Sequence, residues 1–482
     1  MRFLVSLFSV TLLVQISAAQ SRESVIISAS NKYEDPSIFR QILIGKNYRE
    51  TWALPVSMPV FYISKEKGGL KIKELGGGFQ TKSLKMTDKD GVEWVLRTVD
   101  KEVDKTLPPA LRKTFVKKVV QDMISGSHPY GALMVAPLAK ALKVNAPDPE
   151  LFYVPDDPAL GEFRSVFAHS VCMLERAEPT LDNSDTKSTE TLFEKIKEEN
   201  DHLVDDTTLL KARLLDMLVA DWDRHKDQWK WGIRKEDGES FYYPIARDRD
   251  QAFFNSSGIL VKVVRLFAMK QLVGFTKSDR KLKILNKKAW SFDKSLLNEL
   301  DGNVWREIIS RFQVTMNDEL LESAVKNLPA EVYSKDGPII LETLKERRNG
   351  LMEYGMQYYA FLSNDVKVTG SDKEEIVKIS NEGNDLKVTV QDKKSDEVRY
   401  ERNFKSDQTR EIQFDLLAGD DVFIIDKNVS SPIKLSLKGG KGRDKIQVES
   451  RLKIAADQET RNEMKEMSRA FYLTDVTALR EP

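Results

Sequence analysis

Two acidic runs on either side of a hairpin-like segment constrain the fold of this chain more than any other feature. The first run, Asp221–Trp229, reads DWDRHKDQW and follows an apolar helical pattern, and the second, Pro244–Phe253, reads PIARDRDQAF. The turn Lys235–Gly238 lies between them, so we expect both runs to emerge at the same end of a hairpin. Crowded carboxylates repel one another unless they share a cation, and this favours a divalent-metal site that also takes phosphate. The alternative is a solvated pair of loops held by salt bridges.

The region before these runs has the pattern of an antiparallel sheet. Leu70–Leu75, Thr81–Met86 and Glu93–Val99 alternate apolar and polar residues, which predicts three strands. Gly76–Gly78 lies at the first turn, where glycines let backbone amides approach phosphate oxygens closely. A purely structural turn is the alternative for these glycines.

The remaining elements alternate before the chain becomes helical. We expect helices, strands and a polar hinge in the following ranges: helices at 109–125 and 133–142, strands at 151–154 and 165–174, and the hinge at 179–190. Beyond the hinge we expect the helix Thr207–Ala220, with Asp205 or Asp206 as its N-cap, and later helices at 296–312 and 339–361.

The composition changes near Asn364 to short alternating runs separated by turns, which predicts a small antiparallel β domain. Residues 439–447 fit the nonapeptide pattern of calcium-binding β-rolls. A calcium site of that kind forms between stacked repeats, and here only one copy of the pattern is present. Lys441, Arg443 and Lys445 also place positive charge where the ion would lie. We therefore expect a hairpin turn rather than a Ca²⁺ site at 439–447.

Charge and composition exclude several classes of function. The 75 basic and 75 acidic side chains cancel, so no general attraction to nucleic acid is expected. Four His and a single Cys are too few for a zinc cage and rule out an intrachain disulfide. The shortage of His also argues against a two-metal phosphodiesterase.

The N-terminus has the pattern of a signal peptide. Arg2 supplies the charge, Phe3–Val14 the apolar core, and Ser17–Ala19 the small residues of a cleavage site near Ala19. No later run approaches the ~20 apolar residues of a transmembrane helix. We therefore expect an exported protein that is periplasmic or extracellular, most consistent with a Gram-negative envelope. An envelope or outer-membrane partner would be available there.

The expected fold class is α+β, with a two-lobed domain followed by a small all-β domain. The expected boundaries are a signal peptide at 1–19, an N-terminal arm at 20–64, the two-lobed domain at 65–363 with lobes at 65–178 and 191–363, a β-rich domain at 364–450, and a charged tail at 451–482.

The order of these elements resembles the protein kinase-like fold in its atypical branch, over roughly residues 65–361. Asp223-Arg-His225 resembles the catalytic loop of CotH-type and phosphatidylinositol kinases, and Pro244–Phe253 is similar to the metal loop of the CotH type. The resemblance implies an N-terminal lobe made of a sheet and a helix, and a helical C-terminal lobe. It further implies a phosphotransferase that uses Mg²⁺ or Mn²⁺ with ATP and an unknown protein or small-molecule acceptor.

The resemblance also implies a role for particular residues. Asp223 would be the catalytic Asp, which orients the attacking hydroxyl and accepts its proton. The other implied roles are metal binding by Asp248, Asp250 and Gln228, nucleotide binding by Gly76, Gly77, Gly78, Arg97 and Lys101, and bracing of the loop by Arg224 and His225. Asp122, Glu102 and Asp104 are the candidate acidic partners of Arg97.

Two departures from the family pattern leave a second hypothesis open. Gln228 stands where the family commonly has Asn, and Arg97 stands where it usually has Lys, which is not geometrically equivalent. Export also separates the chain from cytoplasmic ATP. The alternative is therefore a catalytically inactive, pseudokinase-type binding or assembly module of the cell envelope.

Overall fold

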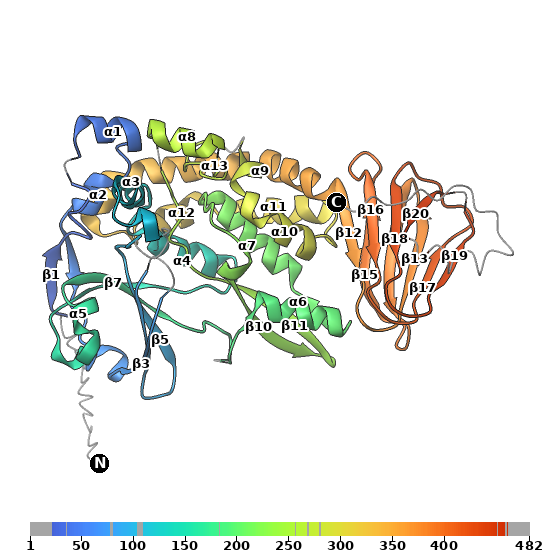
Figure 1. The fold of residues 1–482 in the computed structure, drawn as a ribbon, viewed down its shortest axis with the longest axis horizontal. Helices are drawn as coiled ribbons and strands as arrows, with labels where there is room; N and C mark the ends of the chain where they lie inside the picture. The colour runs from blue at the N-terminus through green and yellow to red at the C-terminus, as the bar shows by residue number, and fades with distance from the viewer. Residues whose placement is uncertain are drawn as a thin grey trace, which may run out of the picture.

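The computed structural model describes residues 22–460 apart from 35, 78–80, 104–108, 183, 256, 268, 279–280, 451 and 458–459. The β domain lies at one end of the long axis, and the sheet-containing N-terminal lobe and the helical lobe lie side by side along the rest (Figure 1). The α+β class is therefore confirmed. The expected signal peptide at 1–19 lies outside the described residues. Within the described part of the chain, no helix is both long and apolar enough to cross a bilayer.

The N-terminal arm is folded into the body of the protein. Strand β1 (Ser24–Ile27) pairs antiparallel with β2 (Val56–Pro59), and helices α1 (Ile38–Ile44) and α2 (Arg49–Ala53) lie between them in sequence. Trp52 is buried, and its indole Nε1 donates a hydrogen bond to the backbone oxygen of Ser127 at 2.9 Å. The arm therefore contributes to the same hydrophobic core as the helical lobe.

The N-terminal lobe contains a five-stranded antiparallel sheet in the order β3-β4-β5-β7-β6. Its strands are β3 (Lys71–Gly76), β4 (Ser83–Thr87), β5 (Glu93–Thr98), β6 (Glu150–Val154) and β7 (Ser170–Arg176). Apolar side chains on one face form a small core that includes Leu84, Leu96 and Phe152. The strand expected at 165–174 begins only at Ser170, because Arg164–Phe167 forms a short helix, α5.

Two helices connect the strands of this lobe, α3 (Phe115–Met123) and α4 (Gly131–Ala141). The single helix expected at 109–125 is divided, because Pro109–Leu111 and Ile124–Gly126 form separate 3-10 turns. Thr114 caps α3 by accepting a hydrogen bond from the backbone N–H of Val116, which sets where the helix begins.

The helical lobe begins with a small sheet rather than with an open hinge. Strand β8 (Lys187–Ser188) and helix α6 (Thr189–Glu198) occupy the end of the expected hinge, and β9 (His202–Val204) follows. Helix α7 (Asp206–Leu218) is capped by Asp205, whose side chain accepts from the backbone N–H of Thr208 at 2.9 Å, as the N-cap prediction required.

The hairpin expected after α7 is present, and the rest of this lobe is helical. Its strands β10 (Trp229–Glu236) and β11 (Glu239–Ala246) lie between β8 and β9 in a four-stranded sheet. The α-helices that follow are α8 (Ile259–Phe267), α9 (Leu282–Leu285), α10 (Trp290–Leu296), α11 (Gly302–Thr315), α12 (Asp318–Val325) and α13 (Ala330–Ser363). The helix expected at 296–312 begins only at Gly302, because Asp301 caps its start by accepting from the backbone N–H groups of Asn303 and Val304.

The β domain contains two sheets in which most neighbouring strands run parallel. One sheet has the order β12-β16-β18-β20 and the other β15-β14-β13-β17-β19. The strands are β12 (Asp365–Thr369), β13 (Glu375–Glu382), β14 (Asp385–Asp392), β15 (Val398–Phe404), β16 (Glu411–Asp415), β17 (Val422–Ile425), β18 (Lys434–Lys438), β19 (Lys445–Val448) and β20 (Ile454–Ala456).

The antiparallel domain expected from the sequence is therefore wrong for all pairs except β13-β14 and β14-β15. From β15 onward the chain alternates between the two sheets. Strands β16, β18, β19 and β20 each lie parallel to the preceding strand of their own sheet, and β17 lies parallel to β13. Alternating polarity is the same for parallel and antiparallel strands, so the pattern predicted the strands without their direction. Strand β20 also extends the domain beyond residue 450, where the charged tail was expected to begin.

The glycine-rich segment at 439–447 is one of several stacked turns between the two sheets rather than a hairpin turn. Asp444 accepts a hydrogen bond from the backbone N–H of Asp421 at 3.1 Å, and Asp421 accepts from that of Glu375 at 2.8 Å. All three carboxylate side chains are buried. The hydrogen bonds of these acidic side chains thus add to the backbone hydrogen bonds between neighbouring turns.

Candidate functional site

The two acidic runs meet where helix α7 ends and the β10–β11 hairpin closes. Trp229 pairs with Ala246 in the hairpin register, so the segments before β10 and after β11 lie side by side. The backbone N–H of Arg247 donates to the Gln228 carbonyl at 3.0 Å, and that of Phe253 donates to the Val219 carbonyl at 2.8 Å. The arrangement expected from the sequence is therefore present.

Both loops contain backbone conformations that favour glycine, although none of the residues involved is glycine. Ala220, Asp248 and Phe253 have φ values of 52°, 56° and 61°. A bulky side chain rarely adopts this left-handed region, so the surrounding contacts must hold Phe253 there. Such strain concentrates at functional sites because it fixes the direction of neighbouring side chains.

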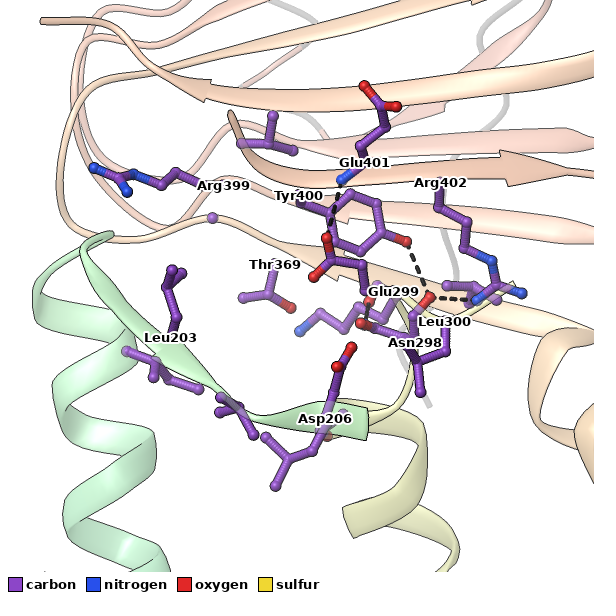
Figure 2. A pocket seen from close by; sticks show the side chains of 18 of the residues that line it. Leu203, Asp206, Asn298, Glu299, Leu300, Thr369, Arg399, Tyr400, Glu401 and Arg402 are labelled. Carbon is purple, nitrogen blue, oxygen red and sulfur yellow. Dashed lines mark hydrogen bonds between the residues drawn. The ribbon is translucent and has the colours of Figure 1, made fainter. Parts of the chain in front are cut away.

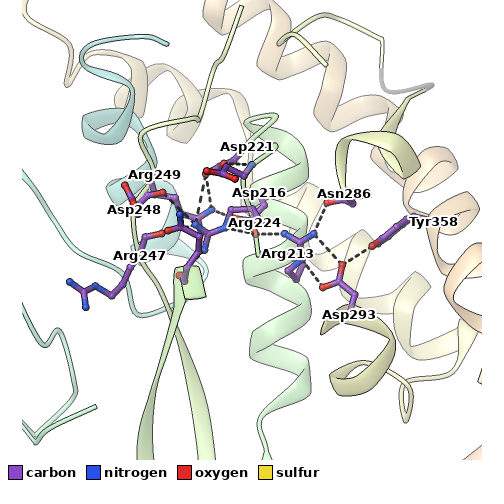
Figure 3. A network of polar contacts seen from close by, with 12 residues as sticks. Arg213, Asp216, Asp221, Arg224, Arg247, Asp248, Arg249, Asn286, Asp293 and Tyr358 are labelled. Carbon is purple, nitrogen blue, oxygen red and sulfur yellow. Dashed lines mark hydrogen bonds and ion pairs between the residues drawn. The ribbon is translucent and has the colours of Figure 1, made fainter. Parts of the chain in front are cut away.

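A buried network of Arg and Asp side chains supports the two loops (Figure 3). Arg213, in the middle of α7, pairs with Asp293 of α10 at 2.8 Å and with Asp216 one turn along its own helix. Tyr358 of α13 donates to Asp293 at 2.7 Å. Asp216 also pairs with Arg249, so the network reaches from α13 to the second acidic run.

Sequence reasoning missed this network, although one signal of it was present. Arg213 and Asp216 are charged residues within an otherwise apolar helical pattern, and both are fully buried. Charges are buried almost only when they are paired, so their position in α7 implied partners elsewhere. Those partners are distant in sequence, which is why spacing alone did not identify them.

Arg224 joins the two acidic runs directly. Its Nη1 donates to the Arg247 carbonyl at 2.6 Å, its Nη2 donates to the Gln228 carbonyl at 3.3 Å, and its guanidinium lies 4.8 Å from the centre of the Trp229 ring. The side chain is almost completely buried. Arg224 thus has the geometry of a loop brace.

Asp248, Asp250 and Lys101 converge from different parts of the chain. Lys101, just after β5, is buried, and its Nζ forms an ion pair with Asp250. Burial disfavours the charge on Asp248, but Lys101 and Arg97 outweigh it and hold the pKa of that carboxyl below its usual value. Burial and the neighbouring Asp248 raise the pKa of Asp250 to about 6. The carboxyls of Asp248 and Asp250 therefore share the same neighbouring cations, and it is unfavourable for both carboxyls to be ionised at once.

Asp223 lies on the edge of this group and faces a cation that the sequence did not indicate. Its carboxylate forms an ion pair with Lys288, which follows α9 and also lies over the ring of Trp222. About a quarter of the Asp223 side chain is exposed (24 %), so it remains accessible to an acceptor from solvent. Asp223 also contributes to the charge environment of Lys101 and Asp250.

Asp221, the first residue of the first acidic run, does not lie on the loop surface. Its side chain is almost completely buried, and its Oδ1 accepts from the backbone N–H of Asp223 at 3.2 Å. Burial raises the pKa of Asp221 to about 7, although Arg224 opposes this. Asp221 therefore shapes the start of the loop that carries Asp223.

Arg97 has a partner other than any of the three expected from the sequence. Its Nε donates to Glu175 of β7 at 2.8 Å. Asp122 is instead held by Arg49 and Arg40, Glu102 pairs with Lys82, and Asp104 lies outside the described residues. Lys101 is thus the cation in contact with the second acidic run, and Arg97 lies behind it on β5.

The remaining candidates are less closely involved. Gly77 has a φ of 113°, and a Cβ there would lie 2.3 Å from the Thr81 carbonyl oxygen, so this turn requires glycine. The nearest neighbours of Gly76 and Gly77 belong to their own hairpin, and Gly78 lies outside the described residues. The His225 ring accepts from the backbone N–H of Asp227 at 3.3 Å and caps a short 3-10 turn.

The donor set fits one magnesium ion held jointly with phosphate rather than a site made by protein alone. In the described part of the chain, no group of three or more His, Cys, Asp or Glu side chains is arranged around a metal position. Asp248 and Asp250 provide two carboxyls, and Mg²⁺ commonly takes one or two carboxylates together with substrate phosphates and water. The Gln228 side chain makes no hydrogen bond to either carboxyl among the described residues.

A large cavity lies elsewhere, between the helical lobe and the β domain (Figure 2). It has a volume of about 1310 Å³, and its walls include Leu203 and Asp206 from the helical lobe and Tyr400 from β15. Burial, together with the neighbouring Glu299, raises the pKa of Asp206 to about 7. None of the candidate site residues lines this cavity.

The chain thus has a sheet lobe and a helical lobe, with the carboxyls of the site at their junction. Among solved structures, it is similar to the proinflammatory kinase CtkA of Helicobacter pylori, with a TM-score of 0.33 and 11% identity over 60% of this chain and 95% of that chain. It is also similar to the Rio2 kinase of Chaetomium thermophilum, solved with ADP, Mg²⁺ and phosphoaspartate, with a TM-score of 0.30 and 13% identity over 64% of this chain and 81% of that chain. No protein-family model and no curated protein matches the chain.

Proposed function

We propose that the chain transfers a phosphoryl group from ATP, bound with Mg²⁺ or Mn²⁺, to a hydroxyl group of a protein or small-molecule acceptor. The observation that carries this proposal is the convergence of Asp223, Asp248, Asp250 and the buried Lys101 from separate elements. Phosphates would neutralise the buried Lys, and a divalent cation would neutralise the pair of carboxyls beside it.

Each residue then has a distinct task. Asp223, whose side chain is about a quarter exposed, orients the acceptor hydroxyl and accepts its proton. Lys101 contacts phosphate oxygens, with Arg97 adding positive charge behind it. Asp248 and Asp250 would hold the metal ion, which when bound neutralises the charge of the phosphates. Arg224 and Arg249 keep the two loops in register.

A transfer assay with matched acid variants tests the proposal. The purified chain is incubated with ATP labelled at the γ-phosphate and Mg²⁺, and transfer to itself or to water is measured. Asp223→Asn should lower the rate by about 10²-fold or more, because general-base catalysis contributes on this order. The same variant should still bind nucleotide.

Asp227→Asn is the matched control, because Asp227 is an exposed acid of the same loop. It should keep the rate of the unsubstituted chain. Equal rates for Asp223→Asn and the unsubstituted chain would exclude Asp223 as the base. Nucleotide binding without any transfer would leave the binding site in place and remove the proposed reaction.

We also propose that the chain is exported after cleavage near Ala19, on the strength of the charge, apolar run and small residues at 1–19. Fractionation of the producing cells, with mass analysis of the N-terminus, should find the chain beginning near Gln20 outside the cytoplasm. Recovery of the full-length chain in the cytoplasm would contradict export.

A further inference from the structure

Two neighbouring helices of the described structure carry an unusual amount of exposed apolar surface. On α1, Ile38 and Phe39 are 77 % and 69 % exposed, and on α8, Leu266 and Phe267 are 65 % and 85 % exposed. Further exposed apolar side chains on the same helices are Ile42, Ile259 and Val263. Soluble proteins rarely expose such large side chains in one place unless the surface binds something.

The outward side chains of α8 form one continuous stripe. Ile259, Val263, Leu266 and Phe267 are separated by four, three and one residues, which places them on one side of an α-helix. Val261 is buried and Val264 packs on the main core from the other side of the same helix. Helix α8 is therefore apolar on the face that meets the protein and also on the face that meets solvent.

A close backbone contact fixes the two helices against one another. A Cβ at Gly258, just before α8, would lie 2.2 Å from the carbonyl carbon of Ile44 at the end of α1. Only glycine allows this approach, and Figure 1 shows the two helices next to each other on one side of the molecule. We refer to the exposed apolar residues of the two helices as the α1–α8 surface.

The charges around this surface have a single sign. Residues 36–48 and 251–278 contain no Asp or Glu, whereas α8 and its flank contain Lys262, Arg265 and Lys270. In the described part of the chain, these three cations form no ion pair. Exposed apolar side chains bordered by unpaired cations complement an anionic lipid surface, in which headgroups meet the cations and acyl chains meet the apolar stripe.

We propose that the α1–α8 surface docks the protein onto an anionic lipid bilayer as a peripheral, non-spanning attachment. A protein partner would need acidic groups around an apolar groove. A bilayer offers anionic headgroups and an apolar interior to the exposed pair of helices. The proposal does not depend on phosphoryl transfer, because no residue of the α1–α8 surface belongs to the candidate site.

Sedimentation with lipid vesicles tests this proposal. The protein used lacks residues 1–19, whose own apolar run would bind lipid whatever the helices do. It should sediment with vesicles of equal parts phosphatidylglycerol and phosphatidylcholine. Its affinity for vesicles of phosphatidylcholine alone should be at least tenfold lower. The double variant Leu266→Ser/Phe267→Ser should lose at least tenfold in affinity, since two large apolar side chains no longer enter the membrane.

Val314→Ser is the matched control, because Val314 is equally exposed but lies on α11. It should bind vesicles as the unsubstituted chain does. If the double variant fails to fold, two further variants keep the test decisive. Phe267→Trp should show a blue shift of its fluorescence with phosphatidylglycerol vesicles, and Lys262→Gln/Lys270→Gln should weaken binding at least fivefold at low salt.

Several outcomes would overturn the proposal. One is the absence of sedimentation with phosphatidylglycerol vesicles, and another is equal binding by the double variant. A third is a dimer in solution that Leu266→Ser/Phe267→Ser dissociates while vesicles remain unbound. The last outcome would assign the α1–α8 surface to a second copy of the chain.

Discussion

At the scale of single residues, the structure divides the charged side chains into two sets with different tasks. Asp223 and Asp250 are partly exposed beside Asp248 and the buried Lys101, whereas Arg213 and its partners are fully buried. The buried set has no solvent to stabilise an unpaired charge, so each of its members depends on the others. This predicts opposite consequences for substitutions in the two sets.

Arg213→Met should destabilise the fold far more than it affects any binding step. It leaves Asp216 and Asp293 without their shared cation, and breaking a buried pair in this way costs about 3–5 kcal/mol. Arg311→Met is the control, since Arg311 is 78 % exposed and pairs only with Glu307. Urea unfolding measures both, and a loss of less than about 1 kcal/mol for Arg213→Met would contradict the network's structural role.

The sequence predicted the carboxyls of the site better than its cations. Asp223, Asp248 and Asp250 stood out because they cluster within two short runs. Lys288 and Arg249 could not be assigned in the same way, because a lone Lys or an Arg between two Asp has no distinctive spacing. Asp122, Glu102 and Asp104 were the predicted candidate partners of Arg97, but the antiparallel pairing of β5 with β7 supplies Glu175 instead.

At the scale of secondary-structure elements, the stacked turns of the β domain hold carboxyls that would otherwise repel one another. Asp421 lies between Glu375 and Asp444, and one of its oxygens has no hydrogen-bond partner among the described residues. Burial raises the pKa of Asp421 to about 8, and the two neighbouring carboxyls add to the effect. The stack is therefore most stable when Asp421 is protonated.

Stability of the β domain should fall as pH rises from 5 to 8. The folded state keeps the Asp421 proton up to about pH 8, whereas the unfolded chain releases it near pH 4, so the folded state binds more protons in this window. Asp421→Asn should remove this loss and gain on the order of 2 to 4 kcal/mol over the unsubstituted chain between these pH values. Asp420→Asn is the control, because Asp420 accepts from Arg443 at the exposed side of the turn.

Denaturant unfolding at a series of pH values measures this difference. Parallel curves for Asp421→Asn and the unsubstituted chain would show that Asp421 is ionised in the folded state.

The strands of this domain were largely predictable from alternation, but their parallel order was not. The direction of each strand depends on how the chain returns to its sheet, and no local sequence pattern contains that information.

At the scale of the whole molecule, the β domain is attached to the helical lobe by specific polar contacts. Arg402 of β15 is buried and donates to the Asn298 carbonyl, to the Ser363 hydroxyl at 2.9 Å and to the Tyr359 hydroxyl at 3.2 Å. These partners lie between α10 and α11 and near the end of α13. Arg402 therefore connects the two units beside the large cavity (Figure 2).

Arg402→Met should uncouple the unfolding of the two units. The Ser363 and Tyr359 hydroxyls lose their donor, whereas the Asn298 carbonyl keeps the hydrogen bond from the Tyr400 hydroxyl at 3.1 Å. An unsatisfied buried polar group costs about 1–3 kcal/mol. Calorimetry should then resolve separate transitions, and trypsin should cut near residue 364 more rapidly. Arg410→Met, at an exposed ion pair with Asp365, is the control, and a single unchanged transition in Arg402→Met would contradict this role.

The division into sheet lobe, helical lobe and β domain was predictable because hydrophobic periodicity and composition change at each boundary. The relative placement of these units was not, because it depends on contacts such as those of Arg402 and of Trp52 in the N-terminal arm. The arm carried little signal of its own, yet Trp52 packs into the core of the helical lobe.

The central claim is that Asp248, Asp250 and Lys101 bind a nucleotide together with a divalent cation. Calorimetric titration of ATP into the purified chain, with and without Mg²⁺, tests this claim most directly. We predict binding that requires Mg²⁺, a loss of tenfold or more in affinity for Asp248→Asn and for Lys101→Met, and unchanged affinity for Asp227→Asn. No binding heat with Mg²⁺, or equal affinity in all variants, would contradict the claim.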